Sequence, residues 1–294
     1  MLSPRPVVVG VDQSSESLRA VEVAARECLA RNVPLRIVHA DLWPAADVPW
    51  DGGDLRAQER VNSVLKSAER RARLVAPGIA VTAAIVDGQD SGVLLAESEG
   101  AELIVIGHRG LGDIAGYLTG ALGLRLAGHT ACPLLIVRTS AAPGGPVVVG
   151  LDDLDDSQGL LDFALSQAQR DGRALVAVHA WLLPTRRAIS PFQTMEYDLL
   201  AAATAESLAA TVERAQSRYP DVAVTCSTPC ERPAAALVDA AAQASLLIVG
   251  SRGSRALHNL LLGSVSTKVT QHSPCSVLVV PTSRTSDLLP SGQV

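Results

Sequence analysis

Short runs of aliphatic residues alternate with longer stretches in which apolar residues recur at helical spacing. In the first half of the chain the aliphatic runs lie near 7–11, 35–40, 79–86, 102–107 and 134–138, and the helical patterns near 16–31, 55–75, 91–99 and 120–130. The runs are continuous rather than alternating with polar residues, which is typical of strands covered on both faces. Strands that alternate with helices predict a parallel sheet with helices on both faces.

The second half of the chain repeats the first. Val7-Val8-Val9-Gly10-Val11-Asp12 recurs 140 positions later as Val147-Val148-Val149-Gly150-Leu151-Asp152, and Leu103-Ile104-Val105-Ile106-Gly107 recurs 143 positions later as Leu246-Leu247-Ile248-Val249-Gly250. This spacing is a whole domain, too long for a solenoid repeat. The sequence therefore predicts two tandem α/β domains, 1–140 and 146–283, each with a five-stranded parallel sheet, followed by a loose tail over 284–294.

The second copy gives the same order of elements. Its strands are expected near 147–151, 174–179, 222–227, 245–250 and 276–281, and its helices near 157–171, 195–218, 233–243 and 264–272.

Composition excludes several classes of protein. The chain has 294 residues, of which 48% are hydrophobic, so it holds ample material for a core. A net charge of −5 and an aromatic content of 3% argue against a nucleic-acid binder. No apolar run approaches the roughly 20 residues of a membrane span. Five scattered cysteines fit a reducing cytoplasm better than a disulfide framework.

Glycines and polar residues follow the strands where a parallel sheet binds ligands, at the carboxyl ends. Asp12 and Asp152 follow the first strand of each copy, Arg109 and Arg252 follow the fourth, and a later glycine opens the next helix. Glycines let a backbone curl around an anion, and a helix start presents unpaired N–H groups to it. This pattern favours a phosphate site, although the two aspartates also suit ordinary helix caps.

The glycine spacing resembles the G-2x-G-9x-G-[S/T] nucleotide signature of the ATP-binding branch of the universal stress protein family. The second copy matches in full at Gly250, Gly253, Gly263 and Ser264, whereas the first has Gly107, Gly110 and Gly120 followed by Ala121. The early V-G-x-D, the V-H-A after the second strand and the closing Cys132-Pro133 block are also similar to the family. The duplication resembles the tandem-domain members of actinobacteria.

This resemblance implies a Rossmann-like fold of the adenine nucleotide alpha hydrolase type, with one ATP site per domain. The implied ligand is ATP, with or without Mg²⁺, and the implied role is a regulator of stress response or growth. The candidate residues of the first site are Gly10, Asp12, Ala40, Gly107, Arg109, Gly110, Gly120 and Ala121. Those of the second site are Gly150, Asp152, Ala180, Gly250, Arg252, Gly253, Ser254, Arg255, Gly263, Ser264 and Val265.

The resemblance assigns a part of the ligand to most of these residues. Asp12 and Asp152 would lie near the ribose and adenine, and Ala40 and Ala180 would line the adenine pocket. The paired glycines after each fourth strand would wrap the ribose and phosphates. The turn from Gly263 to Val265 would hold the β- and γ-phosphates.

Two other functions stay open at this point. One is an enzyme that uses ATP for slow hydrolysis or for adenylyl or phosphoryl transfer, although no catalytic residue or metal ligand stands out. The other is an interaction scaffold with decayed nucleotide sites, which Ala121 hints at for the first copy. His39 and His179 favour structural hydrogen bonds over catalysis. The last strand of each copy is expected to pair the domains within one chain or between chains of a homodimer.

Overall fold

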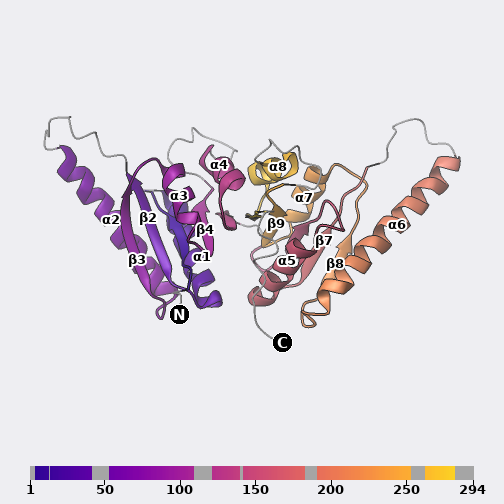
Figure 1. Cartoon of the computed structure of the whole chain (residues 1–294), viewed down its shortest axis with the longest axis horizontal. Coiled ribbons are helices and arrows are strands. Elements are labelled where there is room, and N and C mark those ends of the chain that lie inside the picture. The colour runs from indigo at the N-terminus through magenta and orange to yellow at the C-terminus, as the bar shows by residue number, and fades with distance from the viewer. Residues whose placement is uncertain are drawn as a thin grey trace. The chain divides into compact units, whose positions relative to one another are not determined.

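The computed structural model describes residues 4–12, 14–41, 53–108, 121–139, 142–182, 191–252 and 262–281. The chain divides into two compact units, Met1–Arg138 and Thr139–Val294, and Figure 1 shows strands flanked by helices in each. The predicted fold class is confirmed: each unit is an α/β domain built on a parallel sheet.

The first unit has five strands in the spatial order β3-β2-β1-β4-β5, and every neighbouring pair is parallel. The strands are β1 (Val7–Gly10), β2 (Leu35–Asp41), β3 (Val81–Asp87), β4 (Leu103–Gly107) and β5 (Leu134–Val137). The helices are α1 (Ser15–Arg31), α2 (Gly53–Val75), α3 (Asp90–Ser98) and α4 (Ala121–His129).

The second unit repeats this order as β10-β9-β6-β7-β8, again with parallel neighbours. The strands are β6 (Val147–Gly150), β7 (Leu175–Val178), β8 (Val224–Ser227), β9 (Leu246–Gly250) and β10 (Ser276–Val280). The helices are α5 (Gln158–Asp171), α6 (Pro191–Gln216), α7 (Pro233–Ala241) and α8 (Ser264–His272).

The chain reverses direction across each sheet after the third strand. In the first unit β1, β2 and β3 advance one way, and β4 then lies on the other side of β1. Because parallel crossovers are right-handed, this reversal puts α1 and α2 on one face and α3 and α4 on the other. Helices of each pair pack against one another. The reversal lies between β1 and β4, and in the second unit between β6 and β9, which is where such folds bind ligands.

Burial on both faces explains the continuous aliphatic runs. Val7, Val8 and Val9 in β1 have no exposed surface, and Ile104 and Val105 in the neighbouring β4 have none either. An alternating strand would place a polar side chain under one of the helix layers, so the sequence of these central strands leaves no room for alternation.

No helix among the described residues is both long enough and apolar enough to span a membrane. The five cysteines are free thiols, and the described residues contain no cluster of three or more histidine, cysteine or acidic side chains suited to a metal ion. The tail over 284–294 lies outside the described residues.

A buried carboxylate ties together the first two helices of the second unit. Asp162 of α5 is 1% exposed and accepts a hydrogen bond from the Arg218 guanidinium, just beyond α6. Burial raises the pKa of the Asp162 carboxyl, and Arg218 opposes that rise. Arg218 is half exposed, so the desolvation cost of this pair falls mainly on the aspartate.

We expect Arg218→Ala to lower the free energy of unfolding at pH 7 by about 2 kcal/mol, because it leaves an ionised buried carboxylate without its partner. A carboxyl whose native pKa lies above its unfolded value gains stability as the pH falls through the native pKa. The loss should therefore shrink toward pH 4. Urea unfolding at both pH values measures this, with Arg214→Ala in the last turn of α6 as the exposed control. An equal loss at both pH values would contradict the expectation.

Candidate functional site

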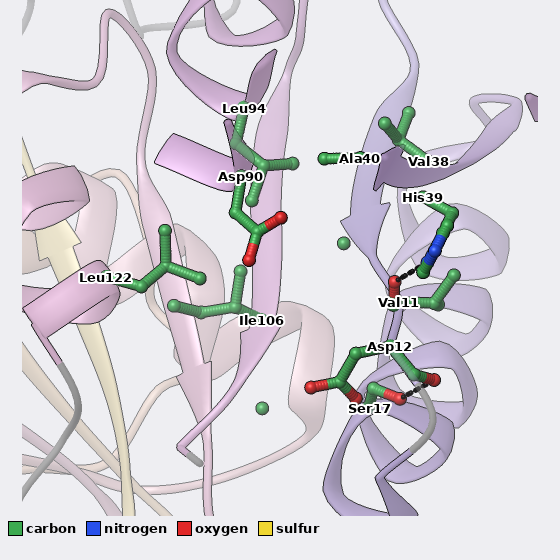
Figure 2. A pocket seen from close by; sticks show the side chains of 12 residues that line it. Val11, Asp12, Ser17, Val38, His39, Ala40, Asp90, Leu94, Ile106 and Leu122 are labelled. Carbon is green, nitrogen blue, oxygen red and sulfur yellow. Dashed lines mark hydrogen bonds between the residues drawn. The ribbon is translucent and has the colours of Figure 1, made fainter. Parts of the chain in front are cut away.

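A pocket lies at the strand reversal of the first unit (Figure 2). Four of the predicted residues line it: Gly10, Asp12, Ala40 and Gly107, which come from the ends of β1, β2 and β4. The apolar residues Val38, Leu94, Ile106 and Leu122 also line the pocket. The parallel topology thus brings together residues almost 100 positions apart in sequence. The result is a largely apolar pocket with a few polar groups at its rim, which is the usual form of a small-molecule site.

Asp12 is fixed by the start of α1. Its Oδ1 accepts hydrogen bonds from the Ser14 amide at 2.8 Å and from the Ser14 hydroxyl. Ser14 caps the helix by accepting from the Ser17 amide at 3.1 Å, and the Ser17 hydroxyl donates back to the Asp12 carbonyl at 3.0 Å. This network gives Asp12 the cap-like role that the sequence allowed. The same carboxylate lines the pocket, so Asp12 can also contact a ligand there.

The glycines at the strand ends have a packing function. A Cβ on Gly10 would come within 3.0 Å of a Leu94 methyl, and a Cβ on Gly107 within 2.9 Å of the Glu16 carbonyl carbon. In the second unit a Cβ on Gly150 would approach Leu237 to 2.7 Å. Helices pack here at distances that admit no side chain. The sequence pattern assigned Gly107 to a nucleotide loop, whereas the structure shows that this glycine first lets α1 approach β4.

His39 and its counterpart are structural. The Nδ1 atom of His39 lies 2.7 Å from the Val11 carbonyl, and that of His179 lies 3.1 Å from the Leu151 carbonyl. Each bond ties the end of the second strand of its unit to the residue after the first. This agrees with the structural interpretation of both histidines.

In the second unit, the start of α8 lies at the carboxyl end of β9. The Gly263 amide donates to the Ser251 carbonyl at 2.8 Å, and the Ser266 hydroxyl donates to the Gly250 carbonyl at 2.6 Å. These bonds hold the first turn of α8 at the carboxyl end of β9. No side chain caps this helix in the described part of the chain. Within the described residues, the amides of Ser264 and Val265 have no acceptor, so they can donate to an anion.

Arg252 lies beside this turn. An added Cβ at Gly263 would be only 3.6 Å from the Arg252 Cα, an ordinary contact, so the backbones of the two residues are adjacent. The structure thus gathers Gly250, Arg252, Gly263, Ser264 and Val265 in one place.

The remaining candidates differ in their surroundings. Asp152 is exposed and belongs to an exposed acidic loop with Asp153, Asp155 and Asp156, and Ala180 is half-buried directly after His179. Ala121 is the exposed first residue of α4. Six candidates lie outside the described residues: Arg109, Gly110, Gly120, Gly253, Ser254 and Arg255.

The first pocket contains an acidic residue that the sequence analysis did not predict. Asp90, at the start of α3, turns its carboxylate into the pocket (Figure 2). Burial raises the pKa of this carboxyl, the nearby Asp12 charge raises it further, and His39 opposes the rise. In the second unit, Pro233 stands in the same place at the start of α7, 143 positions later.

Comparison with known proteins gives a consistent result. The universal stress protein family model matches residues 4–138 and 145–281. A universal stress protein of Mycobacterium tuberculosis is 32% identical over 285 residues, which cover 93% of this chain and 96% of that protein. The crystal structure of a universal stress protein from Archaeoglobus fulgidus covers 94% of this chain and 96% of its own with a TM-score of 0.65 at 17% identity, a likeness of fold. A universal stress protein solved in complex with cAMP is 32% identical and covers 46% of this chain and 98% of its own, with a TM-score of 0.39.

The glycine contacts give a prediction with a matched control. We expect Gly107→Ala to lower the free energy of unfolding by roughly 1–3 kcal/mol, because its Cβ meets the backbone of α1 rather than a flexible side chain. Gly263→Ala should change stability by less than about 0.5 kcal/mol, since Gly263 has a φ of −66° and its Cβ would make only ordinary contacts. Urea unfolding of both variants measures the difference. Equal losses would show that the approach of α1 to β4 is not tight.

Proposed function

Because the chain belongs to the universal stress protein family, we propose that it binds ATP at the strand reversal of each domain and works in the cytoplasm as a nucleotide-dependent regulator of stress response or growth. The binding step is the part that the geometry supports most directly. The regulatory step is supported by the described residues of the first pocket, among which no nucleophile is paired with a base.

The start of α8 is the observation that carries this proposal. A triphosphate needs several hydrogen-bond donors in one place, and an uncapped helix N-terminus supplies amides together with the positive end of the helix dipole. The bonds from Gly263 and Ser266 to the end of β9 fix those amides next to the strand reversal. Arg252, directly after β9, adds a cation to the same neighbourhood.

Each domain would also need a surface for the adenine base, and the pocket of the first domain supports one. Ala40, Leu94, Ile106 and Leu122 offer an apolar surface to a planar ring, and Asp12 offers an acceptor to ribose or amino protons. A base and a polyphosphate would thus lie along the ends of the central strands.

Regulation is favoured over catalysis by what the polar groups of the first pocket already do. The Ser17 hydroxyl donates to the Asp12 carbonyl at 3.0 Å, and the His39 ring bonds the Val11 carbonyl. A serine and a histidine that serve the backbone in this way are not a nucleophile and its base. Slow hydrolysis by recruited Mg²⁺ and water stays compatible with this assignment.

Ser264→Pro tests the proposed phosphate contact without disturbing the helix. Proline suits the first helical position, and Gly263 has φ −66° and ψ 151°, a conformation that a following proline accepts. The change removes one amide donor and one hydroxyl donor. We expect the affinity of the second domain for ATP to fall by about tenfold or more, because a hydrogen bond to a charged group contributes roughly 1.5–3 kcal/mol.

Calorimetry with ATP on the full chain measures this, and Ser264→Ala is the matched control. Ser264→Ala keeps the amide, gives the second domain the residue that Ala121 provides in the first, and should cost less affinity than Ser264→Pro. ATP binding that is unchanged by Ser264→Pro, with the protein folded, would remove the main support for the proposal. Purified protein that shows no affinity for ATP would favour the scaffold alternative.

Turnover separates the regulator from the enzyme. With ATP and Mg²⁺ in excess we expect steady-state hydrolysis below about 1 s⁻¹, the lower end of the usual range for enzymes. A phosphate-release assay measures the rate. Faster hydrolysis that copurifies with the protein and changes with the Ser264→Pro substitution would instead indicate an ATP-dependent enzyme.

A further inference from the structure

The two domains place different side chains at the same point of the site. α3 and α7 are both nine residues long and begin 143 positions apart, at Asp90 and Pro233. The alignment is fixed in space as well, because Leu94 of α3 contacts Gly10 and Leu237 of α7 contacts Gly150. A carboxylate in the first domain therefore stands where the second domain has an uncharged ring.

The Asp90 carboxylate shares the first pocket with that of Asp12 (Figure 2). Burial raises the pKa of the Asp90 carboxyl, the His39 ring lowers it, and the Asp12 charge raises it. Among the described residues neither forms an ion pair with an arginine or lysine. A pocket with two acidic groups resists further negative charge, and the resistance grows where the pocket excludes water.

At the start of the fourth helix, the first domain also lacks two hydroxyl groups that the second domain has. Ala121 replaces Ser264, which removes a hydroxyl from the start of the helix, and Gly123 replaces Ser266, which removes the bond that fixes α8 to β9. These differences, like Asp90, disfavour a triphosphate in the first domain. The apolar surface for a base is kept, whereas the balance of charge and donors moves away from a triphosphate.

We propose that Asp90 is a specificity-determining residue, and that it makes the first pocket select an adenine nucleoside or nucleoside monophosphate over the triphosphate. This inference rests on the proposed function, because it assumes that an adenylate occupies the pocket. The carboxylate accepts hydrogen bonds from ribose hydroxyls or from the amino group of the base and repels a chain of phosphates. The second domain, with Pro233 at this point and Ser264 on α8, keeps the preference for ATP.

Exchange of the two residues tests the inference within one chain. Gln89 before Asp90 has φ −70° and ψ 140°, and Arg232 before Pro233 has φ −62° and ψ 127°, so the backbone admits proline at either place. Asp90→Asn removes the charge and keeps the shape, which covers the case in which Asp90→Pro does not fold. The full chain with Ser264→Pro serves as background, because that change weakens the second site.

Calorimetry with adenosine, AMP and ATP on the Ser264→Pro chain measures the affinity of the first site for each ligand. We expect adenosine or AMP to bind at least tenfold more tightly than ATP, and Asp90→Pro or Asp90→Asn to bring the ligands to within about threefold of one another. In the otherwise unchanged chain, Pro233→Asp should weaken ATP binding to the second domain at least fivefold.

The possible failures are distinct. A first site that binds ATP as tightly as adenosine, or a preference that survives Asp90→Asn, overturns the role of Asp90 and leaves the proposed function standing. A first site that takes none of the three ligands at millimolar concentration overturns both for the first domain.

Discussion

The close approach of helices to the ends of the central strands is the constraint on which the rest of the structure depends. Gly10 lies against Leu94 of α3, and Gly107 lies against the backbone at the start of α1. A side chain at Gly107 would push α1 away from the sheet, and one at Gly10 would displace the Leu94 side chain. Because both positions are glycine, the carboxyl ends of β1 and β4 become the floor of a pocket, and the residues that follow the strands become its rim.

Comparison of the two copies distinguishes the contacts that the fold requires from the residues that could determine which ligand binds. The contact of a glycine with a leucine and the bond of a histidine with a carbonyl occur in both domains. Among the differences between the copies are Asp90 against Pro233 at the pocket and Ala121 against Ser264 at the start of the fourth helix. Two copies under the same packing constraint have thus kept their framework and changed the charge and donor content of their sites.

The sequence predicted the framework well and the site only in part. Continuous aliphatic runs identified the strands, because strands buried on both faces leave little choice of residue. The role of Gly107 could not be predicted, since the helix backbone it meets comes from a segment more than 90 positions away. Asp90 was missed because an acidic residue in the first turn of a helix is ordinary. Only the pocket shows that this carboxylate faces the same space as Asp12.

Unequal sites have a consequence for regulation. Two identical ATP sites would report one quantity, the concentration of ATP, and would fill together. A first site that disfavours a triphosphate and a second that favours it would respond in opposite senses as ATP is consumed, because each ligand shifts only the state to which it binds better. Under the proposed assignments, a single charged residue on α3 would let one chain compare low-charge adenylates with ATP, which is a more direct measure of energy status than either alone.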